Sequence, residues 1–326
     1  MRTLFSLIFV CALSVGCSTP LTQKNSGVSQ MASLESDRII ADDGYELPFR
    51  RYFPEGMSPK SIVIALHGFN DYSFAFDEMC QYFSSRGTAC VAYDQRGFGQ
   101  TSMKGIWPRK GRLQEDLMLV ISLMRKTYPD TEIFVAGESM GGAVVITAAN
   151  LNKEVFTENV SGIILYAPAV WARSTQPWYQ KWALWLSVHT FPSWQPTGDG
   201  LGVQASDNIE ALRAMGRDEH VIKATRIDAV YGLTNLMDAA LVSSHDMPVK
   251  VLVLYGENDQ VIPKNPTCLM LNSMKSNNSD LTFKLYSEGY HMLTRDLESA
   301  RTFGDVQQWI DLQLAHEDSA VIDYCG

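Results

Sequence analysis

The chain has 326 residues, of which 46% are hydrophobic and 19% charged, with 14 Phe, 13 Tyr and 7 Trp. This composition excludes intrinsic disorder, a collagen-like repeat and a coiled coil, and it predicts a globular protein with a full hydrophobic core. Because 27 basic residues face 36 acidic ones, the formal net charge is −9, and we expect no nucleic-acid partner.

The chain starts with a predicted export signal. A basic residue precedes the apolar run 4–15, which has the length of a secretory signal and is short for a membrane span. The run ends in LSVGC at 13–17, which resembles the lipobox of bacterial lipoproteins, where cleavage precedes an acylated cysteine. We therefore predict a signal peptide at 1–16 and a lipid anchor on Cys17, which holds the protein in the bacterial cell envelope. Ser18 favours the outer over the inner membrane, facing either periplasm or surface, and an ordinary signal peptide is the alternative.

Four other cysteines remain after removal of the signal peptide, an even number that can pair in an oxidising compartment. They are Cys80, Cys90, Cys268 and Cys325. Three connectivities stay open. No C-x-x-C pair accompanies them, so we expect no metal site. Residues 17–35 are polar and unpatterned, which predicts a tether between the lipid and the folded protein.

From residue 36 onwards, predicted strands alternate with predicted helices. The turn pair Asp43-Gly44 within 39–53 indicates an early hairpin. Further strands are expected at 61–66, 90–93, 132–136, 162–166, 249–255 and 281–286. Helices are expected near 74–86, 113–128, 141–151 and 297–314. The alternation predicts an α/β fold with a mostly parallel central sheet and helices on both faces.

A G-x-S-x-G motif at 137–141 follows one predicted strand and directly precedes a helix. A serine on so tight a turn needs small neighbours, which Gly137 and Gly141 provide. The strand before and the helix after make a chance match improbable. Ser139 is therefore the predicted nucleophile.

A serine hydroxyl needs a general base that is oriented by a carboxylate. We choose His291 as the base because it follows the last predicted strand, where a loop can reach the sheet edge. Asp259 follows the strand 249–255, and we prefer it to Glu257, which is closer to the strand end. The order serine, aspartate, histidine along the chain is that of α/β-hydrolases.

Acyl transfer also requires donors for the oxyanion. The backbone N–H of Met140, in the first turn of the helix after Ser139, is one candidate. Phe69, in the loop after the strand 61–66, is the second, by analogy of loop position. We expect His67 to brace this loop.

As a set, these motifs resemble the monoacylglycerol lipase and lysophospholipase group of α/β-hydrolases, which is also grouped with serine aminopeptidases. The matching pieces are HGF at 67–69, AYDQRGFGQTS at 92–102, GESMGG at 137–142, YAPA at 166–169, GENDQVIP at 256–263 and GYHMLTRD at 289–296. The resemblance implies the fold and the triad. It also implies a structural role for Asp94, which ties down the loop after its strand. It does not specify the acyl substrate.

The alternation of strands and helices stops after the sixth predicted strand. The resemblance implies a helical cap at 168–245, inserted into a catalytic domain formed by 36–167 and 246–326. Three tryptophans at helical spacing share one face of this cap, and they are candidate substrate-binding residues: Trp178, Trp182 and Trp185. This face could pack the cap onto the core, line an acyl-chain tunnel or touch a membrane interface.

The sequence thus predicts a serine hydrolase that cleaves carboxylic esters of lipids through an acyl-enzyme. Monoacylglycerols and lysophospholipids are the leading substrates, and neither a metal nor an organic cofactor is expected. A peptidase or thioesterase on the same frame is one alternative, and a non-catalytic lipoprotein binding module is another. The oligomeric state stays open.

Overall fold

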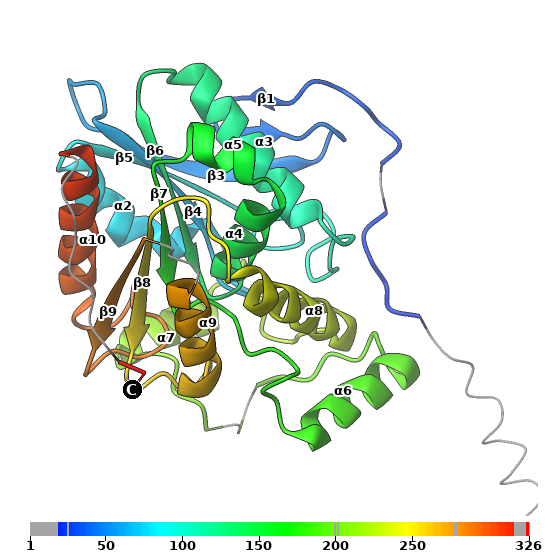
Figure 1. Ribbon diagram of the computed structural model, residues 1–326. Coiled ribbons are helices and arrows are strands. Elements are labelled where there is room, and N and C mark those ends of the chain that lie inside the picture. The colour runs from blue at the N-terminus through cyan, green and yellow to red at the C-terminus, as the bar shows by residue number, and fades with distance from the viewer. Residues whose placement is uncertain are drawn as a thin grey trace, which may run out of the picture.

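A mostly parallel β-sheet forms the middle layer of the protein (Figure 1). The computed structural model describes residues 19–24, 26–198, 200, 202–276, 280–315 and 324–325. Within them the sheet has nine strands in the order β1-β2-β3-β5-β4-β6-β7-β8-β9. The strands are β1 (Ser33–Leu34), β2 (Arg38–Ile40), β3 (Glu46–Tyr52), β4 (Ser61–Leu66), β5 (Thr88–Tyr93), β6 (Glu132–Glu138), β7 (Gly162–Tyr166), β8 (Val251–Gly256) and β9 (Leu281–Tyr286). Strands β4 to β9 pair in parallel, and the first three pair antiparallel.

Helices cover both faces of this sheet. They are η1 (Ser73–Phe76), α2 (Asp77–Ser84), α3 (Arg112–Thr127), α4 (Met140–Leu151), α5 (Lys153–Asn159), α6 (Trp178–Thr190), α7 (Ile209–Arg217), α8 (Ile227–Ser243), α9 (Lys264–Ser276) and α10 (Ser299–Leu314). One apolar cluster joins the sheet to α3, α4, α8 and α9, and a second joins it to α2 and α10. Strands β4, β5 and β8 are therefore buried along their whole length, as their continuous apolar sequences indicate.

The predicted hairpin is confirmed, because β2 and β3 pair antiparallel with Ile40 opposite Glu46. Two helices, α5 and α9, were not predicted. Helix α5 is short, and α9 contains Pro266, a residue that usually marks a loop. Proline is tolerated in the first helical turn, where its missing N–H would have no helical partner.

The four remaining cysteines form two disulfides. Cys80 of α2 is bonded to Cys90 of β5, with their Cα atoms 5.2 Å apart. Cys268 of α9 is bonded to Cys325, near the carboxyl end of the chain, with a Cα separation of 5.5 Å. The sequence left this pairing open because the distances between cysteines arise only when the sheet and helices pack.

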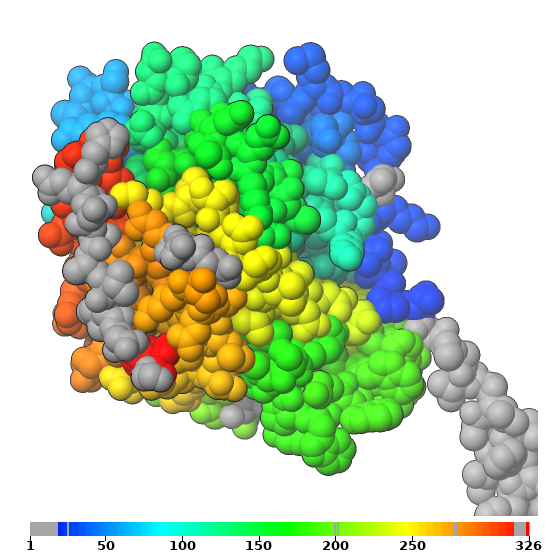
Figure 2. Space-filling model, in the orientation of Figure 1, coloured from blue at the N-terminus to red at the C-terminus, as the bar shows by residue number. Residues whose placement is uncertain are grey.

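The N-terminal segment differs from the predicted tether at 17–35. Gln23 is buried, its N–H donates to Trp107 O at 2.9 Å, and its side-chain amide donates to Ile106 O at 2.7 Å. The N–H of Leu21 donates to Asp228 Oδ2 at 3.1 Å, and in Figure 2 the blue start of the described chain lies against the yellow-green surface of α8. Residues 33–34 then form β1. Polar side chains led to the tether prediction, but here they satisfy backbone groups of the folded protein.

Among the described residues between β7 and β8, where the cap was expected, there are three helices, α6, α7 and α8. β7 is the sixth predicted strand, since the short β1 was not anticipated. The boundaries 168–245 stay a prediction for the cap as a unit. Helix α8 nevertheless packs against the main body, because Leu236, Met237 and Ala240 belong to the core cluster that also contains α4.

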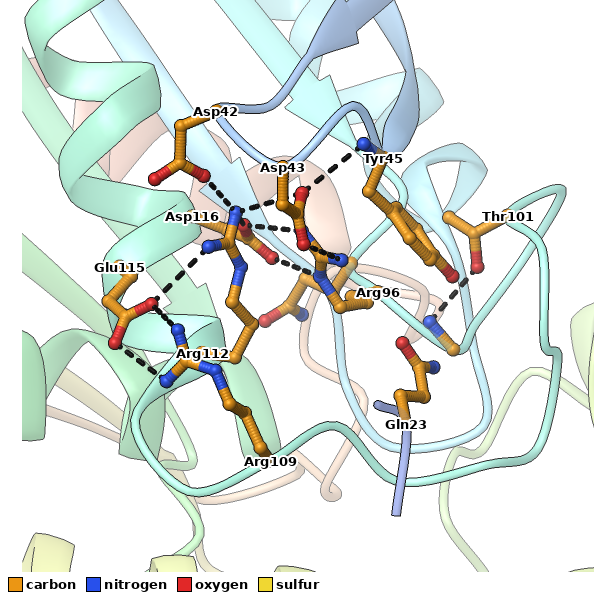
Figure 3. A network of polar contacts seen from close by, with 12 residues as sticks. Gln23, Asp42, Asp43, Tyr45, Arg96, Thr101, Arg109, Arg112, Glu115 and Asp116 are labelled. Carbon is orange, nitrogen blue, oxygen red and sulfur yellow. Dashed lines mark hydrogen bonds and ion pairs between the residues drawn. The ribbon is translucent and has the colours of Figure 1, made fainter. Parts of the chain in front are cut away.

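A buried ionic network fastens the early hairpin to the loop after β5 (Figure 3). Arg96 donates to Asp116 at 2.9 Å and to Asp43 at 2.9 Å, and Arg112 lies 2.8 Å from Asp116. The Arg96 guanidinium also lies over the ring of Tyr45, 3.9 Å from its centroid. Each buried charge has an opposite partner, which a buried ion requires.

Candidate active site

Ser139 lies on the sharp turn between β6 and α4. Its backbone has φ of 50° and ψ of −112°, a strained conformation for a residue with a side chain, and its N–H donates to Tyr166 O at 2.9 Å. A Cβ on Gly137 would lie 2.5 Å from the backbone of Gly141, and one on Gly141 would lie 2.0 Å from Leu66 O. Only glycine fits either position, so the motif is needed for the turn itself.

Asp259 and His291 are brought together from two loops. Asp259 follows β8 and His291 follows β9, and Nδ1 of the histidine lies 2.8 Å from Oδ2 of the aspartate. The other carboxylate oxygen accepts N–H bonds from Val261 at 2.7 Å and Ile262 at 2.9 Å, which fix its direction. Because a carboxylate only accepts, Nδ1 of His291 carries the proton and Nε2 is left to act as a base.

The charge around His291 favours protonation. Burial lowers the pKa of this histidine, but the carboxylates of Asp259, Glu138 and Asp296 together outweigh burial, so that its pKa lies above the ordinary 6.5. Ser139 and His291 both follow carboxyl ends of parallel strands, at one edge of the sheet. Within the described residues, the Ser139 hydroxyl forms no hydrogen bond to His291. Such bonds often form only when substrate is bound.

The loop after β4 lies against the nucleophile. A Cβ built on Gly68 would be 3.5 Å from Ser139 Cβ, so this loop approaches the serine closely. Of the two expected oxyanion donors, Phe69 directly follows Gly68 in this loop, and Met140 directly follows Ser139 at the start of α4. His67 is buried, accepts the N–H of Gln95 at 2.9 Å through Nε2, and has its pKa lowered by burial. It stays neutral and braces the loop.

Asp94 ties two backbone segments together, which is the structural role that the resemblance implied. Its carboxylate accepts the N–H of Ser73 at 2.9 Å and that of Gln100 at 2.8 Å. A Cβ on Gly99 would lie 2.3 Å from this carboxylate, so the loop after β5 wraps closely around it.

The region that contains all of these site residues matches a known protein family. Residues 57–298 match the family described as serine aminopeptidase, S33. The match includes the turn with Ser139 and the loops with Asp259 and His291. The chain belongs to the serine aminopeptidase S33 family.

Two relatives of this S33 chain are named as a lipase and an esterase, one from mouse and one from a plant. Mouse monoglyceride lipase is 26% identical over 284 residues, which cover 85% of this chain and 90% of the mouse protein. Caffeoylshikimate esterase of Arabidopsis thaliana is 25% identical over 285 residues, covering 82% of this chain and 84% of the plant protein.

Solved structures share the fold. A soluble variant of monoglyceride lipase from Saccharomyces cerevisiae superposes with a TM-score of 0.68 at 20% identity, covering 90% of this chain and 99% of that chain. The monoacylglycerol lipase of Paleococcus ferrophilus gives a TM-score of 0.65 at 19% identity, covering 83% and 100%. The predicted α/β-hydrolase fold is thereby confirmed.

Glu138, which directly precedes the nucleophile in this S33 chain, was not among the predicted site residues. Its side chain is buried, and Oε2 accepts a hydrogen bond from Thr294 Oγ1 at 3.2 Å. Thr294 lies on the loop of His291, so this bond joins the serine turn to the histidine loop. Burial raises the pKa of Glu138 to about 7. The sequence offers one signal for Glu138. It is a carboxylate at the end of strand β6, whose other residues are mostly apolar.

A second contact holds the histidine loop to the loop after β4. Arg295 forms an ion pair with Asp71, and both side chains are largely buried. Asp296 accepts the N–H of Tyr290 at 2.7 Å and the hydroxyl of Ser206 at 2.6 Å. Neighbours of His291 on both sides are therefore anchored, which restricts the position of the imidazole.

The three tryptophans proposed as substrate-binding residues are exposed. Trp178, Trp182 and Trp185 lie on α6, with 71%, 64% and 51% of their surfaces accessible. The expectation that they pack the cap onto the core is therefore wrong. Trp182 and Trp185 line a groove of about 350 Å³ whose walls include Tyr231 but none of the residues expected in the triad.

Proposed function

We propose that this enzyme, a serine hydrolase of carboxylic esters, uses Ser139, His291 and Asp259 as its triad and cleaves monoacylglycerols or lysophospholipids. The observation that carries the proposal is the strained serine turn at the sheet edge that also holds the His291–Asp259 pair. Monoglyceride lipases among the relatives support a lipid ester as the substrate, since they align along most of this chain.

The geometry suggests the following steps. Ser139 attacks the ester carbonyl carbon while Nε2 of His291 removes the hydroxyl proton, and Asp259 stabilises the imidazolium. The N–H groups of Met140 and Phe69 donate to the oxyanion. The carbon–oxygen bond to the alcohol then breaks, and His291 returns the proton to that alcohol. Water, deprotonated by His291, then attacks the acyl carbon. The bond from that carbon to Ser139 Oγ breaks, His291 returns the proton to the serine, and the fatty acid leaves.

We propose the cell envelope as the location of the enzyme. Cleavage after residue 16 and acylation of Cys17 are supported by the lipobox-like sequence alone, because both positions lie outside the described residues. No helix in the described part of the chain is long and apolar enough to cross a membrane.

Labelling with a fluorophosphonate probe tests the triad. The wild type and Ser85→Ala, an exposed serine at the end of α2, should both label, whereas Ser139→Ala should not. A panel of monoacylglycerols, lysophospholipids, thioesters and aminoacyl anilides then ranks the substrates. Absence of labelling in the folded wild type would contradict catalysis. Faster cleavage of the anilides would favour the peptidase alternative.

A further inference from the structure

A short segment between β7 and β8 contacts both of the loops that carry the expected acid and base. It comprises residues 204–208, immediately before α7, and we call it the strap. Its Ser206 is completely buried, although serine is usually exposed. Asn208, the last residue of the strap, accepts the N–H of Ala211 at 3.1 Å and so caps α7. The strap and α7 therefore form one continuous unit.

The strap holds the chain directly on one side of the expected base. The N–H of Met292, the residue after His291, donates to Ala205 O of the strap at 2.9 Å. Further along the same loop, the N–H of Leu297 donates to Asp207 Oδ1 at 2.8 Å. The histidine loop is thus bonded to the strap at two points after the imidazole.

On the other side of His291 the strap acts through a buried carboxylate. The N–H of Tyr290, the residue before the base, donates to Asp296 Oδ2 at 2.7 Å. The second oxygen of this carboxylate, Oδ1, accepts the Ser206 hydroxyl at 2.6 Å, and Ser206 Oγ in turn accepts the N–H of Asn208 at 3.1 Å. Both Asp296 and Ser206 are buried, and a buried charged group that loses a hydrogen-bond partner is not readily compensated by water. Without the serine hydroxyl, this carboxylate would be less firmly fixed towards Tyr290.

A third contact of the strap reaches the loop of the expected acid. The N–H of Gln204 donates to Gln260 Oε1 at 3.0 Å, and Gln260 directly follows Asp259. The strap is therefore bonded to residues adjacent to both Asp259 and His291. Its partners are far away in the sequence, since Ser206 and Asp296 are 90 positions apart.

We propose that the strap positions the Asp259–His291 pair for proton transfer, with Ser206 and Asp296 as positioning residues. The inference rests on the proposed function, since it takes His291 as the base. Nε2 of His291 must face the Ser139 hydroxyl while Nδ1 keeps its bond to Asp259, and an error of about 1 Å in such an arrangement costs about 100-fold in rate. Because the strap continues into α7, this unit and the base would move together.

Steady-state hydrolysis of p-nitrophenyl butyrate by Ser206→Ala tests the role of the strap. We expect kcat to fall by about 10- to 100-fold, because Asp296 no longer fixes the chain before the base, and KM to stay nearly unchanged. The matched control is Ser244→Ala. Ser244 is also completely buried between β7 and β8, and its hydroxyl donates to Leu241 O at 2.8 Å, within the end of α8.

Both serine variants should have a lower melting temperature than the wild type, because each loses a buried hydrogen bond. Only Ser206→Ala should lose kcat, so a general loss of stability would not explain its defect. Equal kcat values in Ser206→Ala and Ser244→Ala would overturn the inference.

A second variant keeps the test valid if Ser206→Ala does not fold. Gln260 is exposed, so Gln260→Met should fold like the wild type. It removes the acceptor for the Gln204 N–H, and kcat should fall by about two- to tenfold, the range that corresponds to one net hydrogen bond. An unchanged kcat in this variant would contradict the contact with the acid loop and overturn the inference.

The proton on Nδ1 of His291 gives a spectroscopic readout of position. In its bond to Asp259 this proton should give a downfield NMR signal that is absent from His291→Ala. The signal should be the same in the wild type and Ser244→Ala, and shifted or broadened in Ser206→Ala, where the imidazole has more freedom. An unchanged signal in Ser206→Ala would overturn the inference even if kcat were lower, because the imidazole would not have moved.

Two triad variants separate failure of this inference from failure of the proposed function. Ser139→Ala and His291→Ala should both be inactive. If they are inactive while Ser206→Ala and Gln260→Met behave like the wild type, the role of the strap is wrong and the triad stands. If His291→Ala keeps the kcat of the wild type, the proposed function is wrong and the inference falls with it.

Discussion

Replacing Glu138 by Gln should change how stability depends on pH. Burial raises the pKa of Glu138 from 4.5 to about 7 in the folded protein. Between these values the folded state keeps a proton that the unfolded chain releases, so the free energy of unfolding decreases as pH rises. At 1.36 kcal/mol per pKa unit, the wild type should lose about 3 kcal/mol by pH 8. The glutamine amide stays neutral and can still accept the Thr294 hydroxyl, so the variant should not show this loss.

Urea unfolding at several pH values measures this difference. The variant and the wild type should have similar stability near pH 4, and the variant should be more stable by about 3 kcal/mol near pH 8. Glu154→Gln, an exposed position on α5, is the control and should follow the wild type. A constant difference between Glu138→Gln and the wild type at all pH values would refute the reasoning.

The same substitution should move the pH profile of kcat/KM. The negative charge of Glu138 raises the pKa of His291, and the neutral imidazole is the active base. Without that charge His291 loses its proton at lower pH, so the acid limb of the profile should shift downwards. An acid limb that stays in place, or one that moves to higher pH, would show that the two groups are not coupled.

Three other substitutions test the site and its frame. Gly141→Ala places a Cβ 2.0 Å from Leu66 O, so we expect a lower melting temperature and loss of fluorophosphonate labelling; normal labelling would contradict the packing of the turn. Arg96→Ala removes one of the two arginines that pair with Asp43 and Asp116 and should cost about 3–5 kcal/mol in urea unfolding, whereas a loss below about 1 kcal/mol would mean that the network is weak. In steady-state assays Asp259→Asn should lower kcat by about 10⁴, as in the serine-protease triad, with KM little changed. A similar loss of kcat in Glu257→Gln would argue against Asp259 as the carboxylate of the triad.

Local sequence patterns predicted most of the framework that carries the site. Continuous apolar runs indicated β4, β7 and β8, because strands covered on both faces exclude polar residues. The glycines around Ser139 indicated the turn, because the backbone there leaves no room for a side chain. The positions of Asp259 and His291 after strands then placed them at the edge where Ser139 lies.

Contacts between distant segments could not be predicted in this way. The bond between Glu138 and Thr294 joins residues 156 positions apart, and nothing around either residue indicates the other. The contact of Leu21 with Asp228 spans 207 positions, and it shows that part of the segment predicted to be a tether belongs to the folded protein. Both arise only after the sheet has brought these segments together.

The sequence by itself therefore determined the fold class, the serine turn and the order of the expected triad, since these depend on periodicity and on steric demands within a few residues. Only the tertiary structure decided the disulfide pairing, the buried environment of Glu138 and the exposure of α6. Helical spacing placed the three tryptophans on one face, but it could not say what covers that face. Burial and pKa are set by whatever packs against a residue from elsewhere in the chain, and that information appears only in the folded protein.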